Sequence, residues 1–139
     1  MRKIQVGDKA SFKRTITQQM VDDFARLTGD ENTLHTSKDY AKSLGHKDLV
    51  AHGLLTAAFF SAMSGTHLPG DKSMCLSVEF QFPNPVYPGD ELEYTAEVVK
   101  VSDEYQVVDL DVSCRNQEGT KVLRGKMRVH TKNQTENPS

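Results

Sequence analysis

An uncharged, largely apolar segment in the middle of the chain constrains its fold more than any other feature. From Gly53 to about Met63 the sequence reads GLLTAAFFSAM, without one charged side chain. We predict a helix here, and a helix that is apolar on every side is buried on every side. The chain has 139 residues, which suits one domain with a substantial hydrophobic core. Other parts of that domain must therefore wrap around this helix.

Four later segments have the pattern expected of such a wrapper. In each of them apolar and polar residues alternate, which predicts a strand with one buried face and one solvent-exposed face. Turn-forming residues separate the segments, and an additional strand is expected earlier, at Ala10–Arg14. The four segments are residues 74–82, 91–98, 108–115 and 123–130. Together these elements predict the α+β class and a single hot-dog fold, an antiparallel curved sheet wrapped around a long buried apolar helix. The pattern alone also fits other α+β rolls.

Two further helices are predicted ahead of the apolar one, at Thr17–Leu27 and Lys38–Leu44. Apolar residues recur at helical spacing in the first of them. Either Thr15 or Thr17 supplies its N-cap, and Gly29 stands where a left-handed C-terminal cap belongs. The helices are therefore expected to precede the main part of the sheet.

No repeat or linker divides the chain. Residues 1–130 are predicted to form the single domain, whereas residues 131–139 are polar and aperiodic and are expected to be a disordered C-terminal tail. Cys75 and Cys114 are the two cysteines, and no CxxC pair is present. We therefore expect reduced thiols, with Cys114 in the core, rather than a disulfide scaffold.

Charge and hydropathy argue against several classes of partner. The formal net charge is −2 and no long block of one sign occurs, which speaks against a nucleic-acid partner. No apolar run approaches the roughly 20 residues needed to cross a bilayer. Residues 1–8 lack the apolar stretch of a secretory signal. We expect a cytoplasmic protein that does not bind membranes, with organelle import through a removed transit peptide left open.

A short polar loop between the first two predicted helices carries the chemistry. It holds a carboxylate at Asp30, an amide at Asn32 and an imidazole at His35. Loops on a rigid scaffold are where catalytic groups concentrate. The apolar helix then begins with the sequence His52-Gly53-Leu54-Leu55. A glycine at a helix start exposes backbone N–H groups, so Gly53 is a candidate oxyanion hole.

These residues resemble the MaoC-like hydratase family, which includes the (R)-specific enoyl-CoA hydratases. Asp30, Asn32 and His35 match its D-x-N-x-x-H signature, and the helix start matches its H-G-(apolar)-(apolar) pattern. The flanking residues match as well, so that the resemblance covers nearly the whole chain. Glu31 and Thr33 depart from the residues common in relatives, which bears on substrate preference more than on the reaction class.

The resemblance implies a lyase that hydrates trans-2-enoyl-CoA to (R)-3-hydroxyacyl-CoA, or dehydrates the 3-hydroxyacyl thioester. It implies that Asp30 and His35 share the reacting water. We assign His35 as the principal base and Asp30 as the group that orients the water, with the opposite assignment left open. Asn32 either holds the water or ties the loop to itself as an Asx-turn. The substrate is an acyl thioester of coenzyme A, or alternatively of acyl carrier protein.

Four residues are predicted to bind the substrate: Ser61, His52, Leu54 and Phe60. Ser61 matches a position near the acyl pocket of relatives, whereas His52 is also suited to bonding loop backbone. Bulky side chains such as Phe60 favour short acyl chains. A hot-dog thioesterase and a non-catalytic thioester-binding subunit are the competing functions, and the intact signature disfavours both.

No cofactor and no metal ion are expected, because the chain lacks Gly-rich phosphate loops and the histidine spacings of common zinc sites. We expect a homodimer, because pairing of exposed edge strands about a two-fold axis removes an open sheet edge. The resemblance implies a site at that interface, with acyl-tunnel walls drawn from both subunits.

Overall fold

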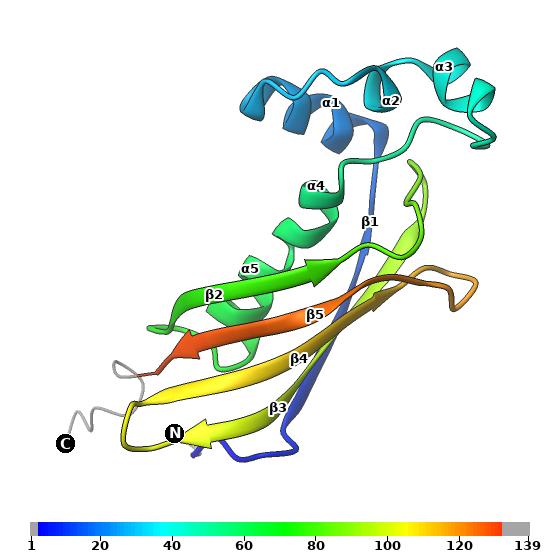
Figure 1. Cartoon of the computed structure of the whole chain (residues 1–139). Helices are drawn as coiled ribbons and strands as arrows, with labels where there is room; N and C mark the ends of the chain where they lie inside the picture. Colours follow the sequence, from blue (N-terminus) through cyan, green and yellow to red (C-terminus); the bar gives the residue numbers. More distant parts are fainter. Residues whose placement is uncertain (1–2, 132–139) are drawn as a thin grey trace.

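Five strands form one antiparallel sheet in the order β1-β3-β4-β5-β2 (Figure 1). The computed structural model describes residues 3–131. The strands are β1 (Lys9–Thr15), β2 (Met74–Gln81), β3 (Glu91–Ser102), β4 (Val107–Arg115) and β5 (Lys121–His130). All five predicted strands are thus present. β3 runs further than predicted, since a bulge between Val98 and Lys100 lets its pairing with β4 continue.

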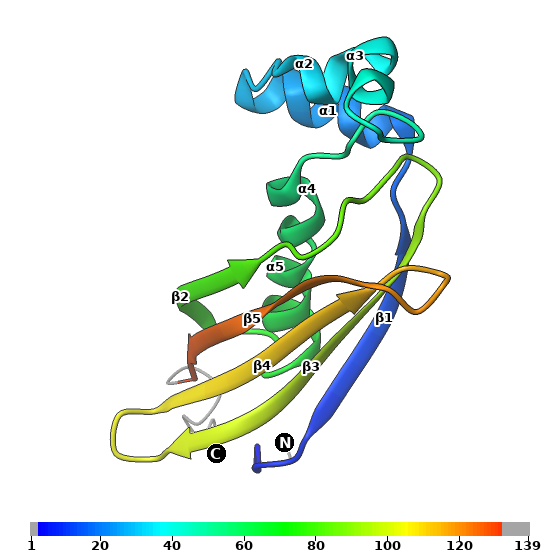
Figure 2. The same ribbon diagram turned by 45° about the vertical axis from the view of Figure 1, so that its right-hand side comes forward.

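The helices form two groups. α1 (Gln18–Thr28), α2 (Thr33–Thr36) and α3 (Lys38–Ser43) gather beyond one end of the sheet, whereas α4 (Gly53–Ala58) and α5 (Phe60–Ala62) lie along one face of it (Figures 1 and 2). A π-helical turn, Met63–His67, follows α5. This is the predicted hot-dog fold, a curved sheet around a central helical segment.

The ends of α1 follow the sequence signals closely. The Thr17 hydroxyl accepts a hydrogen bond from the Met20 N–H, so that Thr17 rather than Thr15 is the N-cap. Gly29 ends the helix with φ of 78°, in the left-handed region that glycine adopts without strain. Asp30 comes directly after this cap, and the cap therefore sets where the loop with the signature residues begins.

The central helical segment differs from the prediction in two respects. It is not one long helix, because α4 ends at Ala58 and α5 begins at Phe60. The buried Tyr94 hydroxyl donates to the Thr56 carbonyl at 2.6 Å, next to this break, and so occupies an acceptor of the helix. Nor is the segment buried on every side, since Leu54 is 67% exposed. One sheet covers only one side of the helix, so the expectation of complete burial was wrong.

The core lies between the sheet and this helical segment. Alternate residues of β3 are fully buried, as the period-two pattern predicts, and Cys114 of β4 is buried as a free thiol. They pack on the inner side of α4 and α5, and prominent members of this core are Phe60, Met63, Leu92, Tyr94, Val98, Leu110 and Leu123. Cys75 is also a free thiol and is exposed, so neither cysteine forms a disulfide.

β2 departs from the predicted pattern of one buried face. Met74 and Val78 are more than half exposed, at 59% and 52%, and Leu76 and Phe82 are exposed as well. The reason is its place in the sheet: β2 is an edge strand that pairs only with β5. Exposed apolar side chains on an open edge strand are unusual in a monomeric protein.

The predicted tail lies almost wholly outside the described residues. Thr131 is its one described residue, and it is buried, with its N–H and hydroxyl both donating to the Gln106 carbonyl. Across residues 3–131 no helix is both long and apolar enough to cross a membrane.

Candidate active site

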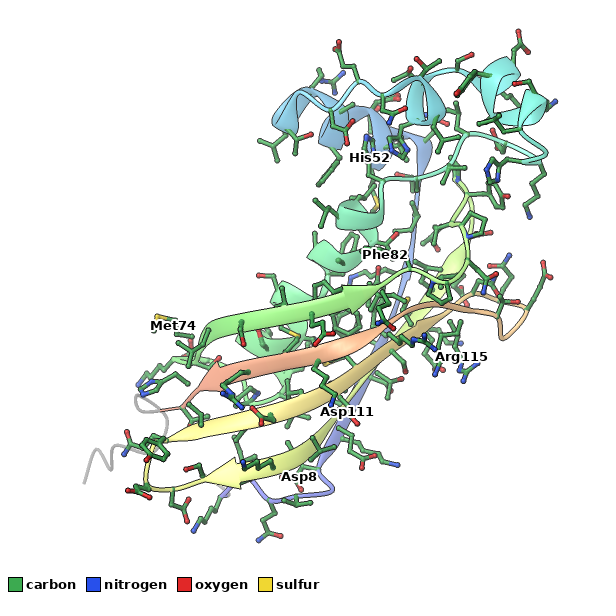
Figure 3. The ribbon with its side chains drawn as sticks, in the orientation of Figure 1. Asp8, His52, Met74, Phe82, Asp111 and Arg115 are labelled. Carbon is green, nitrogen blue, oxygen red and sulfur yellow. The ribbon has the colours of Figure 1, made fainter. Side chains whose placement is uncertain are left out.

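Three side chains from separate parts of the sequence meet where the helical group joins the central helix. They are Asp30 of the loop after α1, His35 of α2 and His52 directly before α4. One carboxylate or ring-nitrogen atom of each lies within 4.8 Å of the others. Figure 3 shows His52 between the α1–α3 group and the start of α4. The structure therefore brings the two predicted acid–base residues together and adds His52 to them.

The loop from Asp30 to Asn32 is ordered by its own side chains. The Asn32 N–H donates to the Asp30 carboxylate at 3.2 Å, and the Asn32 side-chain oxygen accepts from the Leu34 N–H at 3.0 Å. Asn32 is thus the N-cap of α2, a one-turn helix that we did not predict. Of the two roles considered for Asn32, the observed contact is the one that ties the loop to itself.

The ring of His35 is oriented by backbone on the other side of the site. Its Nδ1 lies 2.5 Å from the Val50 carbonyl oxygen, and because a carbonyl only accepts, Nδ1 carries the proton. In the neutral ring Nε2 then has a free lone pair and is able to accept a proton. The Val50 N–H donates in turn to the Leu34 carbonyl at 3.2 Å, so two hydrogen bonds join this part of α2 to Val50.

His52 is buried, with 2% of its surface exposed. Its Nε2 donates to the Asp30 carbonyl at 3.2 Å. Its ring packs on that of His35 with centroids 4.1 Å apart, and on that of Phe24 at 4.8 Å. Burial, the largest influence, lowers the pKa of His52 below its ordinary value of 6.5. At neutral pH His52 is therefore an uncharged member of the cluster that Asp30, His35 and His52 form.

A carboxylate and two imidazoles are also the residue types that bind zinc. In this cluster, however, the rings of His35 and His52 lie against each other with planes 31° apart. Each ring has one nitrogen bonded to a backbone carbonyl. The arrangement is that of a packed pair of rings. The expectation that no metal is needed remains a prediction.

Gly53 begins α4, and a phenyl ring lies directly against it. A Cβ atom added to Gly53 would stand 3.2 Å from a ring atom of Phe82, which is tighter than ordinary contact. Phe82 follows the end of β2 and is labelled in Figure 3 near the start of α4. The glycine therefore lets the ring approach the helix start. As the residue after His52, it is covalently joined to the cluster.

The remaining predicted substrate-binding residues lie outside this cluster. Leu54 and Ser61 are exposed on the central helical segment. Phe60 is fully buried and packs edge-on against Tyr94, with centroids 5.0 Å apart. Their contact with substrate remains a prediction. A depression of about 430 Å³ lies on the outer face of the sheet, around Glu79, Asp111 and Lys126, and no residue of the cluster lines it.

Two residues that shape the site were missed in the sequence. Val50 acts through its carbonyl group, which every residue type carries, so no sequence signal could have identified it. Phe82 was assigned to a strand by its alternation, and its contact with Gly53 depends on how β2 ends against α4. Both contributions arise from tertiary structure alone.

Known proteins resemble both the sequence and the fold. A family model described as the MaoC like domain matches residues 3–120. An (R)-specific enoyl-CoA hydratase from Rhodospirillum rubrum is 34% identical over 126 residues, which cover 91% of this chain and 87% of the relative. A 3-hydroxybutyryl-CoA dehydratase from Methylorubrum extorquens is 35% identical over 111 residues, covering 80% and 71%.

The fold agrees as well. The solved structure of the (R)-hydratase from Aeromonas caviae matches with a TM-score of 0.88 at 29% identity, covering 94% of this chain and 98% of that one. The resemblance first drawn from Asp30, Asn32, His35 and the start of α4 is thus confirmed over most of the sequence and in three dimensions. The chain belongs to the MaoC-like family.

Proposed function

We propose that this chain is a hydro-lyase that adds water to trans-2-enoyl-CoA to give (R)-3-hydroxyacyl-CoA, and that catalyses the reverse dehydration. The observation that carries the proposal is the proximity of the Asp30 carboxylate and the His35 imidazole. Family membership supports the same reaction class, since relatives of similar length are named as hydratases and dehydratases of acyl-CoA.

His35 takes the proton of the attacking water. Its Nδ1–H is engaged by the Val50 carbonyl, which leaves Nε2 as the acceptor. As the water oxygen bonds to the β-carbon, the thioester carbonyl oxygen gains negative charge. Asp30 orients the water and takes part in passing the proton that His35 has taken up to the α-carbon as the enolate collapses, so that both side chains return to their starting protonation states. A positioned acid–base group of this kind contributes roughly 10²–10⁴-fold to the rate.

The backbone N–H of Gly53 stabilises the enolate oxygen in this proposal. Glycine suits this place because the Phe82 ring leaves no room for a larger residue beside the helix start. An N–H aimed at a developing oxyanion is worth roughly 3–4 kcal/mol in other enzymes. The acid–base pair and the oxyanion donor would then act on opposite parts of one acyl group.

We further propose that the working form is a homodimer joined through β2, with substrate held between the subunits. Two observations support it: β2 is an open edge of the sheet, and it exposes Met74, Leu76 and Val78. A two-fold pairing of β2 with its copy would bury these side chains and remove the edge. Leu54 of α4 is exposed as well. A cytoplasmic location and independence of a cofactor remain predictions.

Hydration of crotonyl-CoA, followed by the loss of enoyl absorbance, tests the proposed function. We expect activity in the wild type, and a decrease of about 10²-fold or more in both Asp30→Ala and His35→Ala. Asp39→Asn is the matched control, because it removes an exposed carboxylate of α3 that is not part of the cluster, and it should remain active. Activity that survives both alanine substitutions would refute the site. If the wild type is inactive on crotonyl-CoA, longer chains and carrier-protein thioesters are tested, and inactivity on all of them would refute the reaction.

A further inference from the structure

His52 touches both members of the acid–base pair and also precedes the proposed oxyanion donor. Its Nε2–H donates to the Asp30 carbonyl at 3.2 Å, and its ring lies on that of His35 with centroids 4.1 Å apart. Its own backbone carbonyl accepts the first hydrogen bond of α4, from the Thr56 N–H. One residue therefore connects the loop after α1, the helix α2 and the start of α4.

The protonation state of His52 follows from its contacts. A carbonyl group only accepts, so Nε2 must carry a proton to bond Asp30. Nδ1 is buried and has no hydrogen-bond partner among the described residues. A proton on this atom would be a buried N–H group without an acceptor, which is costly. The contacts therefore favour a neutral ring with its proton on Nε2.

We propose that His52 is a positioning residue of the hydratase site, which fixes the Asp30 backbone and the His35 ring relative to the start of α4 through its Nε2–H donor. This inference rests on the proposed function, since it assigns a role within the same reaction. His52 does not exchange a proton with substrate. It holds the acid–base pair in register with the Gly53 N–H, so that all three groups face one acyl thioester.

The alternative is that His52 merely fills space between Phe24 and His35. Two substitutions separate these roles. His52→Gln retains an N–H donor close to the position of Nε2 but loses the ring, whereas His52→Phe retains the ring but loses the donor. A packing role ranks phenylalanine above glutamine, and a positioning role ranks glutamine above phenylalanine.

The first experiment measures kcat and KM for crotonyl-CoA in both variants. We expect kcat to fall about 10-fold in His52→Phe and less than about 3-fold in His52→Gln, with little change in KM, as the loss of one positioning hydrogen bond implies. His46→Phe is the matched control, since His46 bonds the Tyr87 hydroxyl outside the cluster, and its kcat should equal that of the wild type. Thermal unfolding establishes that each variant is folded. A phenylalanine variant as active as the wild type would overturn the proposal.

A second measurement does not depend on activity. Nitrogen-15 NMR of the histidine rings reports which nitrogen carries the proton, whichever thioester the enzyme accepts. We expect His52 to be neutral with its proton on Nε2 between about pH 7 and about pH 8, above the ordinary imidazole pKa, with Asp30 and His35 as the titratable groups that act on it. A His52 ring with its proton on Nδ1, or one that becomes cationic in this range, would overturn the assignment. An inactive wild type with the expected His52 signal would count against the proposed reaction and leave the assigned contacts standing.

Discussion

The His35 imidazole donates through Nδ1 to the carbonyl oxygen of Val50, a residue 15 positions further along the chain, at 2.5 Å. Because Nδ1 carries the proton in this contact, the lone pair of the neutral ring is on Nε2. It also means that the proposed base is held by main chain rather than by another catalytic side chain. The observed contact of His35 with Val50 and its proposed role as proton acceptor use different nitrogens and are therefore separable by mutation.

Replacing His35 by asparagine should separate them. The asparagine amide reaches the place of Nδ1 and can still donate to Val50, but it cannot accept the proton of water. We expect kcat to fall by about 10²–10⁴-fold while the free energy of unfolding stays near that of the wild type. His35→Leu removes the donor as well, and should lower that free energy by about 1 kcal/mol. Urea unfolding and crotonyl-CoA hydration check this pair, and equal destabilisation of both variants would contradict the structural role.

A methyl group at position 53 should impair turnover by displacing the Phe82 ring. In Gly53→Ala the new Cβ stands 3.2 Å from that ring, so the helix start or the ring must move. We expect kcat/KM to fall about 10-fold, less than the full loss of an oxyanion donor. The double variant with Phe82→Leu should recover part of the activity. Gly65→Ala is the control, since its Cβ would meet nothing within 4 Å, and a similar loss there would refute the explanation.

A charge on the exposed face of β2 should separate the proposed dimer. Val78→Lys places an ammonium group on an apolar edge that would be buried between copies, where an unpaired charge is strongly unfavourable. We expect sedimentation to show a monomer that has lost activity although Asp30 and His35 are intact. Tyr105→Lys is the control, because Tyr105 is 70% exposed in the turn between β3 and β4. An active Val78→Lys monomer would disprove the shared site.

The buried His52 should make the fold sensitive to acid. Burial lowers its pKa in the folded chain, whereas in the unfolded chain it titrates near 6.5. As the pH falls below about 6.5, the unfolded chain therefore takes up a proton that the folded chain does not, and the free energy of unfolding decreases. We expect the drop in Tm between about pH 7.5 and about pH 5.5 to be larger in the wild type than in His52→Gln. An equal drop in both would show that His52 does not contribute.

Much of the architecture follows from local sequence signals. Alternation located four of the five strands, and Thr17 and Gly29 delimit α1 because capping depends on only a few neighbouring residues. The break at Phe59 could not be foreseen. It lies next to a hydrogen bond from Tyr94, a residue 38 positions away from its acceptor Thr56. The exposure of β2 was missed for a related reason, since alternation does not show whether a strand is central or at an edge.

For the candidate site, the sequence indicated the groups that we propose to react and not the contacts that hold them. Asp30 and His35 were identified through the spacing of the signature. The helical turn α2, which carries His35, was not predicted, although Asn32 is a good N-cap residue, because four residues give too short a pattern. The His35 ring is oriented by the Val50 carbonyl group, and the His52 ring by that of Asp30. Backbone atoms are the same in every residue, so these contacts leave no trace in the sequence.

The hydrogen bond from the Val50 N–H to the Leu34 carbonyl closes the intervening segment, which includes α3, into a loop with fixed ends. Lengthening such a loop costs little, since the free energy of closure grows only slowly with length. Natural variation or engineering could therefore exchange residues of this segment beyond α2 while Asp30 and His35 remain in place. The same anchoring would allow related enzymes to catalyse the same reaction while differing in the segment that includes α3.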